Sequence, residues 1–108
     1  MDVIGYIMLD DEKPVASIGI KKVNDTKCEL VRVFVLEQYR KKGYATTLFN
    51  KIQQLARNLG YKEIELVVWC DATNAVSFYK NLGFVLREEK FSEYYGGLKY
   101  AEFDKIIN

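Results

Sequence analysis

A chain of 108 residues with 49% hydrophobic content is long enough to bury one core and too short for two ordinary domains. We therefore expect a single domain over residues 1–108. The 16 basic and 15 acidic residues leave a formal charge of +1, which gives no bulk electrostatic reason to expect nucleic acid or a membrane surface as a partner.

The composition also argues against a metal site. Histidine is absent, and the two cysteines, Cys28 and Cys70, fall inside predicted strands, so no zinc-ligand spacing can be built. No charged segment followed by an apolar run opens the chain, and no apolar stretch is long enough to span a bilayer. We expect a cytoplasmic protein without a metal, in which both cysteines are reduced and act as small hydrophobic residues.

The first part of the chain predicts a hairpin. The largely apolar run from Val3 to Leu9 ends at the acidic turn Asp10-Asp11-Glu12, and Val15 to Ile20 then resumes the strand pattern. A second turn at Asn24-Asp25 leads into a third strand, from Lys27 to Val35, which is rich in β-forming residues.

Strict alternation along this third strand has a consequence for its two faces. Side chains in a strand point alternately to opposite sides of the sheet. The alternation therefore predicts one shared face for Glu29, Val31, Val33 and Val35.

The next part of the chain predicts two helices separated by a strand. The first helix begins near Ala45 and ends at Gly60, with apolar residues at i, i+3, i+4 and i+7 spacing. These residues are Leu48, Phe49, Ile52, Leu55, Ala56 and Leu59. A buried strand is predicted from Glu63 to Cys70, and a shorter helix from Ala75 to Leu82, which stops at Gly83.

Two further strands complete the pattern, because Phe84 to Phe91 and Leu98 to Ile106 flank the turn Tyr94-Tyr95-Gly96-Gly97. The predicted order is three antiparallel strands, helix, strand, helix and two strands. We expect an α/β fold with a mixed, mostly antiparallel sheet and a central parallel strand-helix-strand crossover.

The turn between the third strand and the first helix carries the most informative residues, Arg40-Lys41-Lys42-Gly43-Tyr44-Ala45. A turn that contains glycine and leads into a helix can direct several backbone N–H groups at one anion, aided by the helix dipole. Such a turn predicts a phosphate-binding site, although a basic turn can also be a solvated loop. In open sheets of this kind, ligands tend to bind beyond the carboxyl ends of the central strands, where this turn lies.

Two blocks of the sequence resemble the GNAT (GCN5-related N-acetyltransferase) superfamily. The first runs from Val35 through the basic turn to Ala45, and the second reads Asn74-Ala75-Val76-Ser77-Phe78-Tyr79-Lys80-Asn81-Leu82-Gly83-Phe84. Two motifs in the right order and at the right separation are stronger evidence than either one alone. The resemblance implies an acetyl-CoA-dependent N-acetyltransferase that moves an acetyl group directly to a primary amine.

The same resemblance implies where acetyl-CoA binds. The turn residues would hold its pyrophosphate, mainly through backbone N–H groups, and the end of the preceding strand would pair with the pantetheine arm. The turn residues are Arg40, Lys41, Lys42, Gly43, Tyr44, Ala45 and Thr46, and those of the strand are Val33, Phe34 and Val35. Asn74 matches a family residue that contacts the cofactor, although asparagine at this position could instead cap the helix.

The catalytic residues that the resemblance implies are Tyr79 and Glu29. Tyr79 matches the tyrosine that often protonates the departing CoA thiolate, but it could instead be a packing residue. Glu29 resembles a glutamate that accepts the amine proton through water in some relatives. Glu65 is a rival, and a strand residue that simply faces solvent is the alternative for Glu29.

Relatives usually open with a strand and two helices that form one wall of the acceptor site, whereas Met1 is followed almost at once by what looks like their second strand. The sequence therefore predicts a reduced acceptor half. A second subunit in a homodimer or the Tyr94-Tyr95-Gly96-Gly97 hairpin could supply the wall. A non-catalytic acyl-CoA-binding or interaction module is the alternative function, and the sequence does not identify the acceptor.

Overall fold

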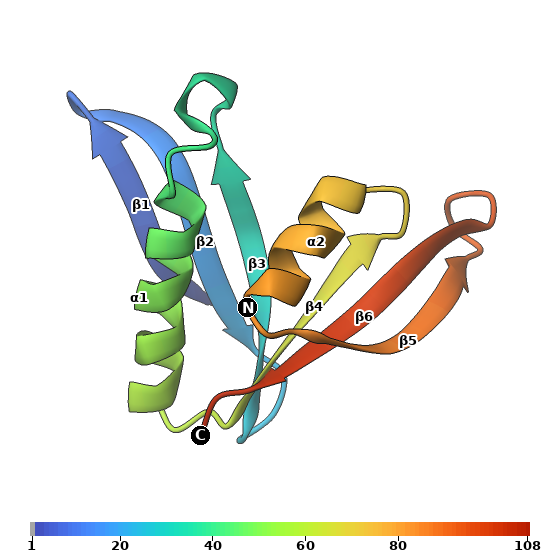
Figure 1. Ribbon diagram of the computed structural model, residues 1–108. Coiled ribbons are helices and arrows are strands. Elements are labelled where there is room, and N and C mark those ends of the chain that lie inside the picture. The colour runs from blue at the N-terminus through green and yellow to red at the C-terminus, as the bar shows by residue number, and fades with distance from the viewer. Residues whose placement is uncertain (1) are drawn as a thin grey trace.

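The computed structural model describes residues 2–108 and shows a six-stranded mixed sheet with two helices on one face (Figure 1). The strands are β1 (Val3–Asp10), β2 (Lys13–Lys22), β3 (Lys27–Val35), β4 (Glu63–Trp69), β5 (Val85–Ser92) and β6 (Leu98–Ile106). The helices are α1 (Tyr44–Asn58) and α2 (Thr73–Asn81), and a short 3₁₀ turn, η1 (Glu37–Tyr39), precedes the basic turn. Every predicted helix and strand is present, within about two residues of its expected ends.

The strand order is β1-β2-β3-β4-β6-β5. The β3–β4 pair is parallel and is connected through α1, whereas the other neighbouring strands are antiparallel. This topology confirms the predicted α/β fold with a single parallel crossover at the centre of the sheet.

The hydrophobic core lies between the two helices and one face of the sheet. Of the α1 side chains predicted from its periodicity, Leu48, Phe49, Ile52 and Ala56 are buried and Leu55 is partly buried. The prediction is wrong for Leu59, which is exposed at the C-cap, where the helix ends. Across the core, the Phe49 ring meets the edge of Phe84, which follows α2, at a centroid distance of 5.6 Å. The two helices therefore share one continuous core.

The central strands separate soon after they begin. β3 and β4 are paired over three positions only. The pairs are Lys27↔Glu63, Cys28↔Ile64 and Glu29↔Glu65. Beyond them the two strands diverge, with α2 in front of the divergence (Figure 1). We call this divergence the splay. It leaves the facing backbone edges of β3, up to Val35, and of β4, up to Trp69, without a neighbouring strand.

A β-bulge at Arg32 interrupts β3 close to the splay. The pairing with β2 shifts between Ser17 and Gly19, and the φ angle of Arg32 is 56°, in the left-handed region. The Ser17 hydroxyl donates a hydrogen bond of 2.7 Å to the carbonyl of Arg32, which holds the bulge in place. A bulge adds one residue to one strand and therefore reverses the alternation of side chains beyond it.

The bulge corrects one prediction from the sequence. Cys28 and Leu30 are buried on the helix face before the bulge, and Val33 and Val35 pack against the same core after it. Glu29 therefore lies on the opposite face from Val35, and the expectation that they share a face is wrong. We call the face of the sheet away from the helices, which includes Glu29, the open face.

Burial also determines the protonation state of one cysteine. Cys28 is fully buried in the core as a free thiol, and burial raises its pKa to about 11, so the thiol stays protonated.

Among residues 2–108, no helix is long and apolar enough to cross a membrane.

Candidate active site

The basic turn lies at the N-terminus of α1 and has an open backbone. Gly43 is the N-cap residue with a φ of 80°, and Lys41 has a φ of 60°. Within residues 2–108, the N–H groups of residues 41–46 have no hydrogen-bond partner, and the first N–H that bonds back is that of Thr47, to the Gly43 carbonyl. A run of unpaired N–H groups at the start of a 15-residue helix is suited to bind an anion.

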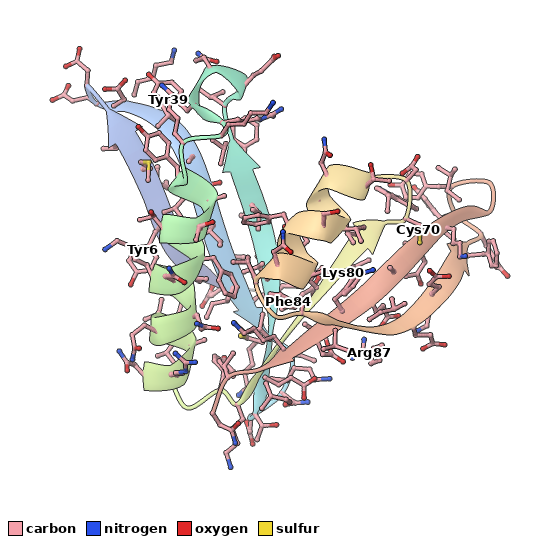
Figure 2. The ribbon with its side chains drawn as sticks, viewed as in Figure 1. Tyr6, Tyr39, Cys70, Lys80, Phe84 and Arg87 are labelled. Atoms are coloured by element: carbon pink, nitrogen blue, oxygen red, sulfur yellow. The ribbon has the colours of Figure 1, made fainter. Side chains whose placement is uncertain are left out.

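Contacts on the N-terminal side of this turn hold it in place. The N–H of Leu36 donates to the carbonyl of Val15 at 2.9 Å. The hydroxyl of Tyr39, which is labelled in Figure 2, donates to the carboxylate of Asp10 at the tip of the β1–β2 hairpin. The ammonium of Lys42 lies over the Tyr39 ring at 5.8 Å from its centroid. The anion-binding backbone is therefore fixed before any ligand arrives, which lowers the entropic cost of binding.

Besides its predicted role in phosphate binding, Arg40 makes a structural hydrogen bond that the sequence did not predict. Its Nε–H donates a hydrogen bond of 2.8 Å to the carbonyl of Val35, the last residue of β3. This bond ties the start of the turn to the end of the strand that borders the splay. The turn and the end of β3 are thus one unit, because residues 40–46 follow β3 through η1 and Arg40 is bonded to its last residue.

Helix α2 borders the splay on its other side. Its N-cap residue is Ala72, and no side chain caps the helix. The alternative role of Asn74 as the helix cap is therefore wrong, because Asn74 lies inside the first turn. Its side chain is exposed, and within residues 2–108 it makes no hydrogen bond to another side chain or to the backbone. Asn74 is free to contact a ligand.

Tyr79 lies in the middle of α2 and is half-buried. Its ring packs between Phe78, at 5.4 Å, and Phe84, at 5.8 Å, both in edge-to-face geometry. Burial raises the pKa of the phenol above its ordinary value of 10.0, so the hydroxyl is protonated at neutral pH. Within residues 2–108 the hydroxyl donates to no protein acceptor. Tyr79 therefore both packs and carries a proton that it can donate.

The two candidate bases face each other where the strands separate. Glu29 of β3 and Glu65 of β4 form the last pair before the splay, and both lie on the open face. Each carboxylate is held by cations. Lys21 lies 3.5 Å from Glu29, and Lys27 and Arg87 lie 3.4 and 3.7 Å from Glu65. Both carboxylates lie at the start of the splay, so each is a candidate general base.

An aromatic cluster on the open face was not predicted from the sequence. Trp69 at the end of β4 is paired across the sheet with Tyr100 of β6, and Tyr95 from the β5–β6 loop folds onto the indole. The sequence carries one signal for it, since Val67 and Trp69 alternate with core residues on the same strand. That signal did not reveal which strand of the sheet would lie beside them.

The family comparison covers most of the chain. The model of the acetyltransferase (GNAT) family matches residues 2–84. Human N-acetyltransferase 8 is 28% identical over 91 residues, which cover 80% of this chain and 40% of the human protein. An N-acetyltransferase of Methanocaldococcus jannaschii is 37% identical over 60 residues, which cover 56% of this chain and 26% of the relative. The chain thus spans less than half the length of these two relatives.

Solved structures share the fold. Ard1 from Thermoplasma volcanium superposes with a TM-score of 0.84 at 24% identity, over 90% of this chain and 66% of that one. A GNAT family acetyltransferase from Elizabethkingia anophelis, solved with acetyl-CoA bound, superposes with a TM-score of 0.85 at 12% identity, over 93% and 73%. Together with the family match over residues 2–84, these results show that the chain belongs to the GNAT acetyltransferase family.

Proposed function

We propose that this protein is a cytoplasmic acetyl-CoA-dependent N-acetyltransferase that moves an acetyl group directly to a primary amine. The observation that carries the proposal is the junction of three features at one end of the sheet. The unpaired N–H groups of residues 41–46 and the free edge of β3 lie at the same end of the sheet, and helix α2, which carries Tyr79, lies in front of the splay (Figure 1).

The basic turn and the end of β3 would bind different parts of acetyl-CoA. Residues 40–46 would bind the pyrophosphate, with the N–H groups as donors and Lys41 and Lys42 as nearby positive charge. The free edge of Val33–Val35 would pair with the amides of pantetheine, and Asn74 would bind the same arm from α2. Acetyl-CoA supplies the activated acyl group, and the protein's task is to orient it.

Proton transfer would use residues on both faces of the sheet, Tyr79 on the helix face and a glutamate on the open face. Tyr79, which keeps its proton at neutral pH, would donate to the thiolate as it leaves. Glu29 would accept the amine proton through water, with Glu65 as the alternative base, since both lie on the open face from which an amine would enter. An N–H near Val35 would polarise the thioester carbonyl.

The substitution Tyr79→Phe tests the acid role. It should lower kcat by about tenfold to ten-thousandfold if thiolate protonation limits the rate, while the Kd for acetyl-CoA changes little. Thiol release from acetyl-CoA, measured with a panel of primary amines, reports turnover, and calorimetry reports binding.

Tyr61→Phe is the matched control, because Tyr61 is also a half-buried tyrosine packed against the core but follows α1, far along the chain from α2. An equal rate in both variants would remove Tyr79 from the mechanism. Binding of acetyl-CoA by the parent without turnover of any amine would instead favour a non-catalytic acyl-CoA-binding module.

A homodimer is part of the same proposal, because the open face carries exposed apolar side chains that a second subunit could cover. Light scattering of the purified protein should give twice the mass of one chain. A monomeric mass at all concentrations would remove the second subunit from the acceptor site.

A further inference from the structure

A hollow of about 330 Å³ lies on the open face beside the splay, at the end of the sheet away from the paired carboxylates. Its lining residues come from β4, β6 and the β5–β6 loop. They are Val67, Val68, Trp69, Ser92, Tyr95 and Tyr100. Because Trp69 is the last residue of β4, the hollow adjoins the free edge that borders the splay. The hollow therefore lies on the β4 side of the splay.

Three aromatic rings form the walls of the hollow. The rings of Tyr95 and Tyr100 lie 5.4 and 6.2 Å from that of Trp69, at interplanar angles of 89° and 86°. Both tyrosines are thus almost perpendicular to the indole. Rings set at right angles present faces in more than one direction, and the face of an aromatic ring attracts a cation, most strongly in tryptophan.

A row of charged side chains on β3, β4, β5 and β6 continues from the hollow along the open face. Its carboxylates outnumber its cations. The carboxylates are Glu63, Glu65, Glu102 and Asp104, and the cations are Lys27, Arg87 and Lys90. Glu102 is paired across the sheet with Val67 and so lies next to the hollow. The excess of negative charge would attract a cationic ligand and repel an acidic one.

From these features we infer that the hollow receives the acceptor of the reaction, and that this acceptor is a small alkylammonium compound. The inference rests on the proposed function, since it identifies the substrate class of that site. The alkyl chain would lie against Val67, and the ammonium would lie over the rings. It would pass its proton through water to Glu29 or Glu65, and the neutral amine would then attack the thioester carbonyl. The CoA thiolate would leave and take the proton of Tyr79. The volume is sufficient for a small alkylammonium group.

Trp69 allows a direct binding test, because it is the only tryptophan in the chain. Its fluorescence should be quenched in a saturable way by choline, and more weakly by 3,3-dimethylbutan-1-ol, which has the same shape without the charge. The expected ratio of the two dissociation constants is about twofold to thirtyfold, the range of cation–π interactions. Equal dissociation constants, or no saturable quenching, would overturn the inference.

Matched variants of the loop test the geometry. Tyr95→Leu should weaken choline binding by about twofold to tenfold, and Tyr95→Phe should restore it, because the ring and not the hydroxyl carries the attraction. Tyr94→Leu is the control, since Tyr94 is the neighbouring residue, is 88% exposed and does not line the hollow. Equal effects of the Tyr94 and Tyr95 substitutions would count against the site.

Two further titrations separate this inference from the proposed function. Acetyl-CoA binding by calorimetry tests the cofactor site alone, so binding of acetyl-CoA without quenching by choline would reject only the inference. Quenching by choline without acetyl-CoA binding would reject the proposed function and, with it, the assignment of the ligand as an acceptor. Tighter quenching by a lysine-containing peptide than by butylamine would overturn the assignment to a small amine.

Discussion

Gly43 and Gly60 provide a matched test of the anion-binding turn, because they flank the same helix and have the same local constraint. Their φ angles are 80° and 92°, and a Cβ added at either position meets no atom within 4 Å. Alanine at either site should therefore cost only the strain of a left-handed backbone, about 1–2 kcal/mol. For a domain of this size, each kcal/mol lowers Tm by roughly 4–8 °C.

The two substitutions should differ in what they do to ligand binding. A Cβ at Gly43 would stand where the phosphate must approach the backbone, and the loss of one charge-assisted hydrogen bond costs about 1.5–3 kcal/mol. Gly43→Ala should therefore weaken acetyl-CoA binding by about tenfold to a hundredfold. Gly60→Ala, at the far end of α1, should leave binding unchanged.

Thermal melts and calorimetric titration of acetyl-CoA into both variants measure the two effects independently. Similar losses of Tm with a loss of affinity in Gly43→Ala alone is the expected pattern. Equal affinities in the two variants would refute the placement of the pyrophosphate at this turn, and a much larger Tm loss in one variant would refute the strain argument.

Two other predictions concern stability. Hydrogen bonds from Lys90 and Arg87 lower the pKa of Glu102 below its ordinary 4.5, so its contribution is present above that pH and is lost as pH falls through the lowered pKa. Glu102→Gln should cost about 1 kcal/mol in urea unfolding at pH 7, and this difference from the parent should shrink toward pH 3. A difference that stays constant with pH would contradict the ion pairing. Gly5→Ala should cost about 1–3 kcal/mol, because its Cβ would overlap the carbonyl of Ile18 on β2, and an unchanged urea midpoint would show that β1 can shift without loss.

The order and type of the elements were predictable because each carries a strong local signal. The apolar stripe of α1, closed by Gly60, has the period of a helix, and the turn at Tyr94-Tyr95-Gly96-Gly97 separates two runs with strand composition. Local patterns of this kind depend on neighbours a few residues away. They survive in the fold because tertiary contacts agree with them.

The bulge at Arg32 could not be predicted in the same way. Arginine has no preference for a left-handed backbone, and no glycine or asparagine marks the position. The bulge depends on the pairing with β2 and on the hydrogen bond from Ser17, which is 15 residues away. The face of Glu29 was therefore assigned relative to Val35 from an alternation that the strand does not keep.

The residues of the candidate site could be identified where they follow one another in the chain. They were harder to identify where separate segments meet in the fold. Residues 40–46 form one turn, and that turn was identified from its own sequence. The bond from Arg40 to Val35 and the cluster around Trp69 depend on which backbone groups and strands become neighbours. The cluster follows from the strand order, in which β6 lies between β4 and β5, whereas the Arg40 bond follows from the path of the chain after β3.

The β3–β4 contact divides the sheet into two halves, β1–β3 and β4–β6, that are joined by three strand pairs and by the core that α1 and α2 share. A bound acyl-CoA whose amides pair with β3 would occupy the splay as an additional strand does and would contact both halves of the sheet. Bound acyl-CoA would then complete the hydrogen bonding of the sheet. The complex would therefore be more rigid and more stable to unfolding than the free protein. Release of CoA would remove these hydrogen bonds, so the free form would be the more flexible one.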